Sequence, residues 1–398
     1  MKHSKLKRQA LFAIVATGAM AVTCATSAQT VQGGGSTLAQ PLYEELFGII
    51  DGWPSQVTGT WSYVGVNSGT GKSAFINNTA SSFGKAGNVH FAGSESALTA
   101  QDIVNYTTAH NNGSNSTGTN YGRLIQIPIA LTSVVLPYSA PNGSGITELN
   151  LTRQQVCQIF SGQTTTWGAL LNSADYTPIT LVYHAKTSGT TELLSNFLAA
   201  SCTDYLPADQ SFTVSNSFAT MVSNAGGIRS NWVAATGSLG VSTAMETSGR
   251  IAYLSPAYTF PPSDAERVAK IDGALPYSIT FPSSAKPPAN VVARNNPLNW
   301  VPSYELPWDS AVYPIYGTVN MLFNQCYADG TGSGTVGAAV KDFLTKLYDG
   351  TFDASIESNY FIKLPAEWNS AISTVFLTPT NSLGIGNTSV CNGIGRPS

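Results

Sequence analysis

HAKTSGTTELL, at residues 184–194, joins two segments with different hydrophobic patterns. The stretch ITLVYHA, at 179–185, is rich in apolar and β-branched residues, as a buried strand is, whereas residues 190–200 repeat leucine and phenylalanine at helical spacing. The turn between them contains Thr187, Ser188, Gly189 and Thr190. A strand that leads through a short turn into a helix is the repeating unit of α/β domains, so this stretch predicts an α/β fold.

A turn of this kind is able to hold an anion. The first N–H groups of a helix have no partner within the helix, and the helix dipole places partial positive charge there. Hydroxyl groups add donors, and Gly189 would let a ligand approach the backbone, which together favour an oxyanion. Serine and threonine are also the ordinary N-cap residues of helices, so this turn alone is equally consistent with capping.

The same pattern occurs twice more in the chain. GGGST, at 33–37, precedes a helix predicted from about Pro41, and SGTG, at 68–71, separates a predicted strand from a helix. Three such turns favour a cleft into which several helices direct their N-termini. The segment GTGKS, at 69–73, ends like a nucleotide-binding P-loop, but the first glycine of that motif would fall on Val66, so we reject nucleotide binding.

Glu95 follows a predicted strand, VHFAG at 89–93. The usual position of a glutamate is the protein surface. The alternative is a carboxylate that faces the same cleft as the three turns, which would favour a ligand that carries a proton of its own.

Apolar runs alternate with helix-like segments over the rest of the chain, which favours mostly parallel sheets. The runs that we interpret as strands lie at 62–66, 89–93, 125–139, 179–185, 238–244 and 315–323. The polar, glycine-rich stretch 110–122 is expected to be an exposed loop. Ten of the 21 prolines lie between Pro256 and Pro307, which predicts a long irregular segment outside the central sheets.

Residues 1–28 have the composition of a secretory signal peptide, with a basic start, an apolar run and small residues before a cleavage site after Ala28. No later stretch has the roughly 18–20 apolar residues of a membrane span. We therefore expect an exported protein, either periplasmic or secreted. Without the signal peptide the chain has 15 basic and 22 acidic residues, a formal net charge of −7, which does not suit nucleic acid as a partner.

Four cysteines remain after removal of the signal peptide: Cys157, Cys202, Cys326 and Cys391. An even number in an oxidising compartment predicts two disulfides, and the lack of CxxC spacing or nearby histidines argues against a zinc site. Three pairings are possible. The sequential pairing, Cys157–Cys202 and Cys326–Cys391, closes the shortest loops.

Eight segments occur in an order and at intervals typical of one family. They are GGGSTLAQPLY, YVGVNSGTG, FAGSESALT, IQIPIALTSVVLPYS, LTRQQVCQIFSGQTTTW, SGTTELLSNFL, GSLGV and YPIYGTVNMLF. Together they resemble the periplasmic phosphate-binding proteins of ABC importers, of the PstS type, and more closely their DING relatives. The disulfide pattern of the DING branch agrees with the sequential pairing.

This resemblance implies a two-lobed α/β fold of the type II periplasmic binding proteins. The lobes would be joined by two crossover strands, near Ile127 and Tyr313, with the ligand held between them. Lobe one would comprise residues 29–127 and 314–398. Lobe two would comprise residues 128–313, including the proline-rich segment 256–307.

The resemblance also implies which residues bind the ligand. The matching positions are Thr37, the backbone of Leu38, Ser68, Ser188, Gly189 and Thr190. Two positions depart from the family: its aspartate is Glu95 here, and its arginine is His184, with Lys186 in place of the acid that supports that arginine. Thr30-Val31-Gln32 stands where DING proteins begin with Asp-Ile-Asn.

These departures have physical consequences for the ligand. Glutamate is one methylene longer than aspartate, and histidine offers fewer donors than arginine and is charged only below a pKa ordinarily near 6.5. Loss of a bidentate arginine contact would cost about 1.5–3 kcal/mol of anion affinity. Lys186 would restore the charge only if it turned inward. We therefore expect phosphate binding that is weaker than in the family and declines as His184 loses its proton, or a preference for a related oxyanion.

The sequence thus predicts an exported solute-binding protein, in preference to an enzyme, that takes phosphate or a related oxyanion without cofactor or metal. We expect a monomer that serves an ABC permease or scavenges phosphate. A first alternative is a secreted alkaline phosphatase-like hydrolase of the DING type, with Ser188, His184 and Glu95 as nucleophile, base and acid, although the sequence has no clusters of metal ligands. A second is a secreted adhesion or signalling protein that has lost tight phosphate binding.

Overall fold

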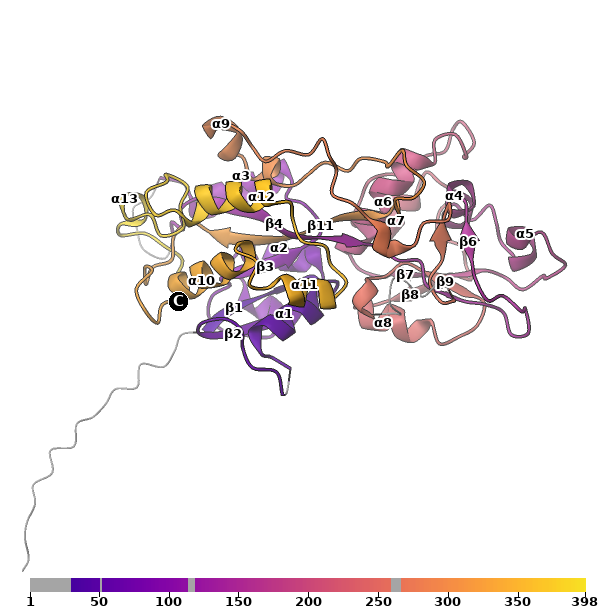
Figure 1. Ribbon diagram of the computed structural model, residues 1–398, viewed down its shortest axis with the longest axis horizontal. Coiled ribbons are helices and arrows are strands. Elements are labelled where there is room, and N and C mark those ends of the chain that lie inside the picture. The colour runs from indigo at the N-terminus through magenta and orange to yellow at the C-terminus, as the bar shows by residue number, and fades with distance from the viewer. Residues whose placement is uncertain (1–29, 51, 114–118, 259–265) are drawn as a thin grey trace, which may run out of the picture.

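The computed structural model describes residues 30–50, 52–113, 119–258 and 266–398, and the predicted signal peptide lies outside them. The described chain forms an elongated molecule with a sheet at each end (Figure 1). We refer to the part built on a five-stranded sheet as lobe one and the part built on a four-stranded sheet as lobe two. None of the helices in the described ranges has the length and apolar character that crossing a bilayer requires.

Lobe one contains a mixed sheet with the strand order β2-β1-β3-β11-β4. Its strands are β1 (Thr30–Gly35), β2 (Thr60–Gly65), β3 (Phe91–Ser94), β4 (Leu124–Ser133) and β11 (Tyr316–Asn324). Strand β1 pairs in parallel with β2 and β3, whereas β11 is antiparallel to β3 and β4.

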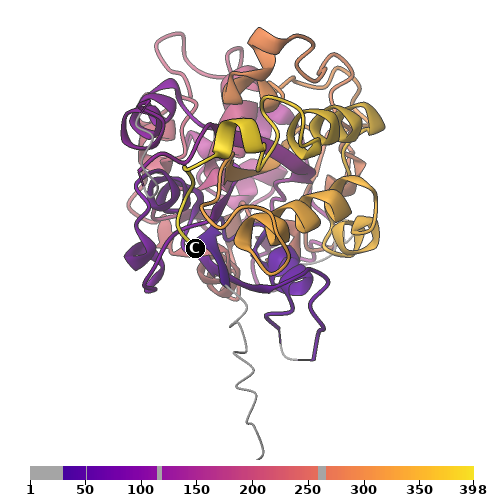
Figure 2. The same ribbon diagram turned by 90° about the vertical axis from the view of Figure 1, so that its left-hand side faces the viewer.

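Helices cover both faces of this sheet, as the view from the lobe one end shows (Figure 2). They are α1 (Gln40–Phe47), α2 (Ser68–Ile76), α3 (Ala100–His110), α10 (Val336–Tyr348), α11 (Asp353–Ser358), α12 (Ala366–Ile372) and α13 (Thr388–Cys391). Apolar side chains of α1, α10 and α12 form one core with the sheet, and those of α2 and α3 form a second.

Lobe two contains a sheet with the order β5-β9-β7-β8 and a separate pair, β10-β6. The strands are β5 (Tyr138–Ser139), β6 (Asn150–Leu151), β7 (Thr180–His184), β8 (Val233–Ala235), β9 (Arg250–Ala252) and β10 (Lys270–Ile271). The helices are α4 (Arg153–Phe160), α5 (Trp167–Leu171), α6 (Gly189–Ser201), α7 (Phe218–Val222) and α8 (Gly237–Ala244). A further helix, α9 (Val291–Arg294), belongs to the proline-rich segment.

Strands β4 and β11 connect the two lobes and pair with each other along their length (Figure 1). Side chains on β4 up to Ala130 belong to the core of lobe one, whereas Leu131 belongs to that of lobe two. On β11, Val319 and Met321 pack in lobe one and Tyr316 packs in lobe two. The predicted two-lobed α/β fold with two crossover strands is therefore confirmed.

Two expectations about the strands are wrong. The sheet of lobe one is not mostly parallel, because β11 returns the chain from lobe two to lobe one and so runs antiparallel to β3 and β4. In lobe two the expectation holds, since β7 pairs in parallel with β8 and β9 and only β5 pairs antiparallel, with β9. Residues 238–244, expected to be a strand, form helix α8. Gly237, two residues after the end of β8, turns the chain with a φ of 67°, and the buried side chains Ser238 and Val241 recur at helical spacing while Leu239 is exposed.

The proline-rich segment is largely irregular and packs against the crossover strands. Between Pro256 and Pro307, the described residues form only β10, α9 and three short 3-10 turns. The carbonyl of Pro297 accepts a hydrogen bond from the side chain of Gln126 on β4 (3.0 Å), and that of Glu305 accepts one from the Tyr316 hydroxyl on β11 (2.7 Å). The segment therefore covers one side of the junction between the lobes.

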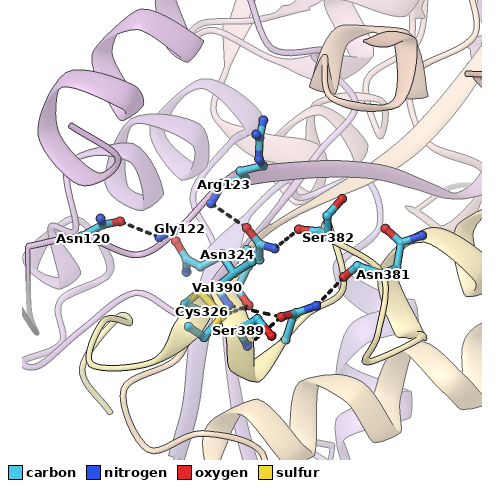
Figure 3. The surroundings of a disulfide bond; sticks show 12 residues. Asn120, Gly122, Arg123, Asn324, Cys326, Asn381, Ser382, Ser389 and Val390 are labelled. Atoms are coloured by element: carbon cyan, nitrogen blue, oxygen red, sulfur yellow. Dashed lines mark hydrogen bonds between the residues drawn. A yellow bond between two sulfur atoms is a disulfide. The ribbon is translucent and has the colours of Figure 1, made fainter. Parts of the chain in front are cut away.

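The structure contains two disulfides in sequential pairing. Cys157–Cys202 links α4 to the end of α6, and Cys326–Cys391 links the end of β11 to α13. Hydrogen bonds between nearby chain segments surround the second disulfide (Figure 3), among them one from the Arg123 N–H to the side chain of Gln325 (3.3 Å). This disulfide ties the C-terminal part of the chain to lobe one.

Candidate functional site

The N-terminus of α6 in lobe two lies directly against lobe one. A Cβ atom added to Gly189 would lie 2.5 Å from Oε2 of Glu95 and 2.6 Å from Oγ of Ser68, distances at which atoms clash. Ser68 is the first residue of α2, and Glu95 follows β3. The structure thus brings three of the predicted ligand-binding residues together at the interface between the lobes.

The carboxylate of Glu95 is the centre of this cluster and is 3% exposed. It accepts a hydrogen bond from Oγ of Ser36, at 2.6 Å from either oxygen, and one from Oγ of Ser68 at 3.0 Å. Burial raises the pKa of Glu95 to about 7, although the hydrogen bonds from Ser36 and Ser68 act in the opposite direction. Near neutral pH this group is therefore able either to accept or to donate a proton.

Ser36 is a site residue that the sequence reasoning missed. Its Oγ donates to Glu95 and accepts a hydrogen bond from the N–H of Leu38 at 3.0 Å. The N–H of Leu38, which was predicted to donate to the ligand, thus donates to Ser36 within lobe one. Ser36 immediately follows the three glycines and precedes Thr37, but only the fold shows that its side chain faces Glu95.

Ser188 precedes α6 in the N-cap position, yet its side chain makes no capping hydrogen bond. The main-chain N–H of Ser188 donates a hydrogen bond to the carbonyl of Asn216 (2.8 Å), and its side chain is almost fully buried. Capping therefore does not account for this serine. The first turn of a 13-residue helix begins here, with Gly189 and Thr190 both buried at the interface. This is the arrangement of N–H donors and helix dipole that favours an anion.

Thr37 contacts lobe two at the N-terminus of α8 instead of α6. Its Oγ1 lies 3.0 Å from Oγ of Ser238 and accepts a hydrogen bond from the N–H of Ser238 at 3.2 Å. The neighbouring carbonyl of Leu38 accepts a hydrogen bond from Oγ of Ser255 at 3.1 Å. In this arrangement Thr37 and Leu38 join the two lobes.

Asn67 adds a contact that the sequence did not reveal. Its φ of 131° is in a region that favours glycine, and such strain tends to occur at functional sites. Its Oδ1 accepts hydrogen bonds from the N–H of Thr70 (2.8 Å) and from Oγ1 of Thr187 (3.4 Å) in the turn before α6. The turns before α2 and α6 therefore meet across the interface.

His184 is the last residue of β7, shortly before the first turn of α6, and its imidazole carries no charge near neutral pH. The Tyr253 hydroxyl accepts a hydrogen bond from the N–H of His184 (3.2 Å) and is bonded to Oγ1 of Thr191 (2.8 Å). The imidazole is 4% exposed, and burial lowers the pKa of His184 to about 4. The expected loss of charge from His184 between mildly acidic and alkaline pH is therefore wrong, and Lys186 is exposed instead of turned inward.

Two α/β lobes on two crossover strands, with buried hydroxyls and a helix N-terminus where the lobes meet, define a two-lobed binding protein of the periplasmic type. The chain belongs to the PBP superfamily, because residues 21–348 match its domain model.

Known proteins are similar in sequence to nearly the whole chain. It is 41% identical to alkaline phosphatase L of Pseudomonas aeruginosa strain PAO1, over 96% of this chain and 98% of that protein. It is 37% identical to a phosphate-binding protein of an unknown prokaryotic organism, over 92% of this chain and all of that one.

Solved structures that are similar to this chain also include phosphate-binding proteins. A phosphate-binding protein from Stenotrophomonas maltophilia is 34% identical with a TM-score of 0.82, over 93% of this chain and all of that one. A high-affinity periplasmic DING protein solved with phosphate at pH 8.5 is 37% identical with a TM-score of 0.79, over the same shares. The resemblance to phosphate-binding proteins of the DING type is confirmed.

Proposed function

We propose that the protein is an exported solute-binding protein that holds phosphate, or a closely related oxyanion, between its lobes for ABC-type uptake or for scavenging. The observation that carries this proposal is the start of α6. Its N-cap serine does not cap the helix, and its first residues lie against a buried carboxyl group on the opposite lobe. The phosphate-binding relatives support the same class of ligand.

The proposed ligand would be bound by hydrogen bonds, without a positively charged side chain. The N–H groups of Gly189 and Thr190 and the hydroxyl of Ser188 would donate to the oxyanion. Glu95 would share a proton with it, since a carboxyl group with a pKa of about 7 matches an anion that carries protons near neutral pH. A sulfate dianion has no proton to share, so we expect phosphate to bind in preference to sulfate.

Calorimetric titration of the mature protein with phosphate and sulfate tests this proposal. We expect saturable binding of phosphate, and Ser188→Ala should weaken it by about tenfold, the effect of losing one hydrogen bond to a charged group. The matched control is Ser217→Ala, which removes an N-cap serine whose side chain does cap its helix, α7. Equal loss of affinity in the two variants, or no phosphate binding by the unaltered protein, would contradict the proposal.

A hydrolase is a second candidate, because three relatives at 37–41% identity are named alkaline phosphatase L. Hydrolysis of a phosphate monoester, measured with and without added divalent metal ions, decides between the two. Turnover that Ser188→Ala abolishes would favour the enzyme. Binding without turnover would favour the solute-binding protein.

The affinity for phosphate should fall by about tenfold between pH 6 and pH 8.5, the effect of a one-unit difference in pKa between the free and bound protein. The cause is Glu95: above its pKa of about 7, an ionised carboxylate faces an anion that is itself losing a proton. Glu95→Gln cannot ionise, so this variant should lose the part of the pH dependence that comes from Glu95 and retain only the part that comes from the ionisation of phosphate itself. Titrations in buffers of different ionisation enthalpy would also measure the proton uptake directly. An unchanged pH dependence in Glu95→Gln would exclude Glu95 as its source.

Ser36→Ala should raise the affinity for phosphate by about 3- to 10-fold at pH 8, the effect of releasing one hydrogen bond. The substitution frees the N–H of Leu38 to donate to a ligand. It also removes a hydrogen bond that lowers the pKa of Glu95, so the carboxyl group stays protonated to a higher pH. Titration calorimetry of the variant measures the change. A loss of affinity would mean that the Ser36 hydroxyl itself binds the ligand.

A further inference from the structure

A cavity of about 490 Å³ adjoins the proposed anion site, with Glu95 in its wall. Three parts of the molecule line it. Lobe one contributes Glu95 and Thr318, α6 of lobe two contributes Glu192 and Asn196, and the proline-rich segment contributes residues including Ser303 and Tyr304. The function proposed above uses only the Glu95 side of this space.

The cavity is too large for a tetrahedral oxyanion alone. Its volume lies within the range of about 300–1,000 Å³ that is typical of sites for organic ligands. Aliphatic side chains such as Leu131 and Leu193 form part of the wall. A ligand that fills both sites would therefore join an oxyanion to an organic group.

The polar part of the lining is acidic or neutral, because its described residues include no lysine, arginine or histidine. Glu192 borders the cavity, and its Oε1 accepts a hydrogen bond from the N–H of Ala97 at 3.2 Å. Lys72 does not line the cavity: it donates to the carbonyl of Ala97 (2.8 Å) and pairs with Asp102 (3.3 Å), and its positive charge favours the ionised form of Glu192. The lining thus disfavours a second anionic group and suits a cation.

Two tyrosine rings add to this preference. Tyr304 and Tyr316 both line the cavity, and their ring centres are 5.2 Å apart. The hydroxyls of Tyr304 and Tyr316 donate to the carbonyls of Pro314 (2.8 Å) and Glu305 (2.7 Å), respectively. A ligand in the cavity would therefore contact the aromatic rings of these tyrosines and not their hydroxyl groups. Aromatic faces beside a carboxylate are a favourable environment for an ammonium group.

We propose that this cavity binds the organic part of a phosphate monoester of an amino alcohol. The phosphoryl group would occupy the site at the start of α6, and the ammonium end would lie near Glu192, Tyr304 and Tyr316. This inference rests on the proposed oxyanion site and names a larger ligand class for it.

Calorimetric titration with phosphoethanolamine, propyl phosphate and inorganic phosphate tests the inference. Propyl phosphate matches phosphoethanolamine in size but has no charge on its organic end. We expect phosphoethanolamine to bind about tenfold more tightly than either of the other two, the effect of one partly desolvated charge contact. Glu192→Gln should reduce that preference over propyl phosphate to about threefold or less.

A second pair of variants tests the cavity itself. Ser303→Trp places an indole at an exposed position of the lining, whereas Ser283→Trp does so at an exposed serine of the same segment that does not line this cavity. We expect Ser303→Trp to abolish the preference for phosphoethanolamine while inorganic phosphate binds as before, and Ser283→Trp to change neither. If Ser303→Trp does not fold, the Glu192→Gln titration decides.

The outcomes separate this inference from the proposed function. Binding of inorganic phosphate with exclusion of both esters would overturn the inference and leave the oxyanion site intact. An unchanged preference in both Glu192→Gln and Ser303→Trp would overturn it as well. Absence of binding by all three compounds would overturn the proposed function, and the inference with it.

Discussion

We expect Gly189→Ala to lower the affinity for phosphate at the proposed site by about 10- to 100-fold, the effect of overpacking a closely packed contact. The added methyl group would lie 2.5 Å from the carboxylate of Glu95 and 2.6 Å from Oγ of Ser68. Neither neighbour is free to move, because both side chains are buried and hydrogen-bonded to each other. The start of α6 must therefore move away from lobe one, and its N–H donors would no longer converge with Glu95 on a ligand. Titration calorimetry measures the loss.

Gly240→Ala is the matched control for this prediction. Gly240 also lies in the first half of a helix of lobe two, α8, but a Cβ atom there would meet its nearest neighbours at an ordinary distance of 3.8 Å. We expect it to leave phosphate binding unchanged. The thermal stability of both variants should remain close to that of the unaltered protein, because the clash in Gly189→Ala is relieved by separating the lobes. Full affinity in Gly189→Ala would show that the closely packed interface is not the binding form.

We expect Arg396→Ala to lower the free energy of unfolding by about 3–5 kcal/mol, the combined effect of a core cavity and unsatisfied acceptors. Arg396 is fully buried although only two residues of the sequence follow it. Its guanidinium donates to the carbonyls of Phe75 (2.8 Å) and Val89 and to Oδ1 of Asn78 (3.0 Å). It also lies over the rings of Phe75 and Tyr121, with 4.4 and 4.5 Å to the ring centres.

Urea unfolding followed by circular dichroism measures this effect. The control is Arg123→Ala, which removes an exposed arginine of lobe one and should change the free energy of unfolding by less than about 0.5 kcal/mol. The C-terminal segment that holds Arg396 lies on lobe one, beside the second disulfide (Figures 2 and 3). Equal stability of the two variants would mean that this segment does not contribute to the core.

Local sequence patterns were sufficient to predict the parts of the site that depend on chain neighbours. The turn that contains Ser188 and Gly189 joins β7 to α6 as expected, because an apolar strand and a helix with regular leucine spacing flank it. Residues 238–244 show the limit of the same reasoning. Their short apolar run fits a strand or a helix equally well, and the turn at Gly237 decides between them.

Contacts between distant residues could not be predicted from such patterns. The bond between Ser36 and Glu95 joins residues 59 positions apart, and that between Thr37 and Ser238 joins residues 201 positions apart. The charge state of His184 could not be predicted from the sequence either, because burial in the folded protein lowers the pKa of its imidazole. The family resemblance predicts which positions bind the ligand, but the side chains Glu95 and His184 differ from the family, and only the fold shows what surrounds them.

A crystal structure of the mature protein with arsenate at about pH 6 would show where the anion binds, since arsenic is located by its anomalous scattering. We expect one arsenate between the lobes, within hydrogen-bond distance of the main-chain N–H groups of Gly189 and Thr190, with the carboxyl group of Glu95 on its other side. Arsenate bound elsewhere, with the first turn of α6 making no contact to it, would mean that the start of α6 is not the anion site.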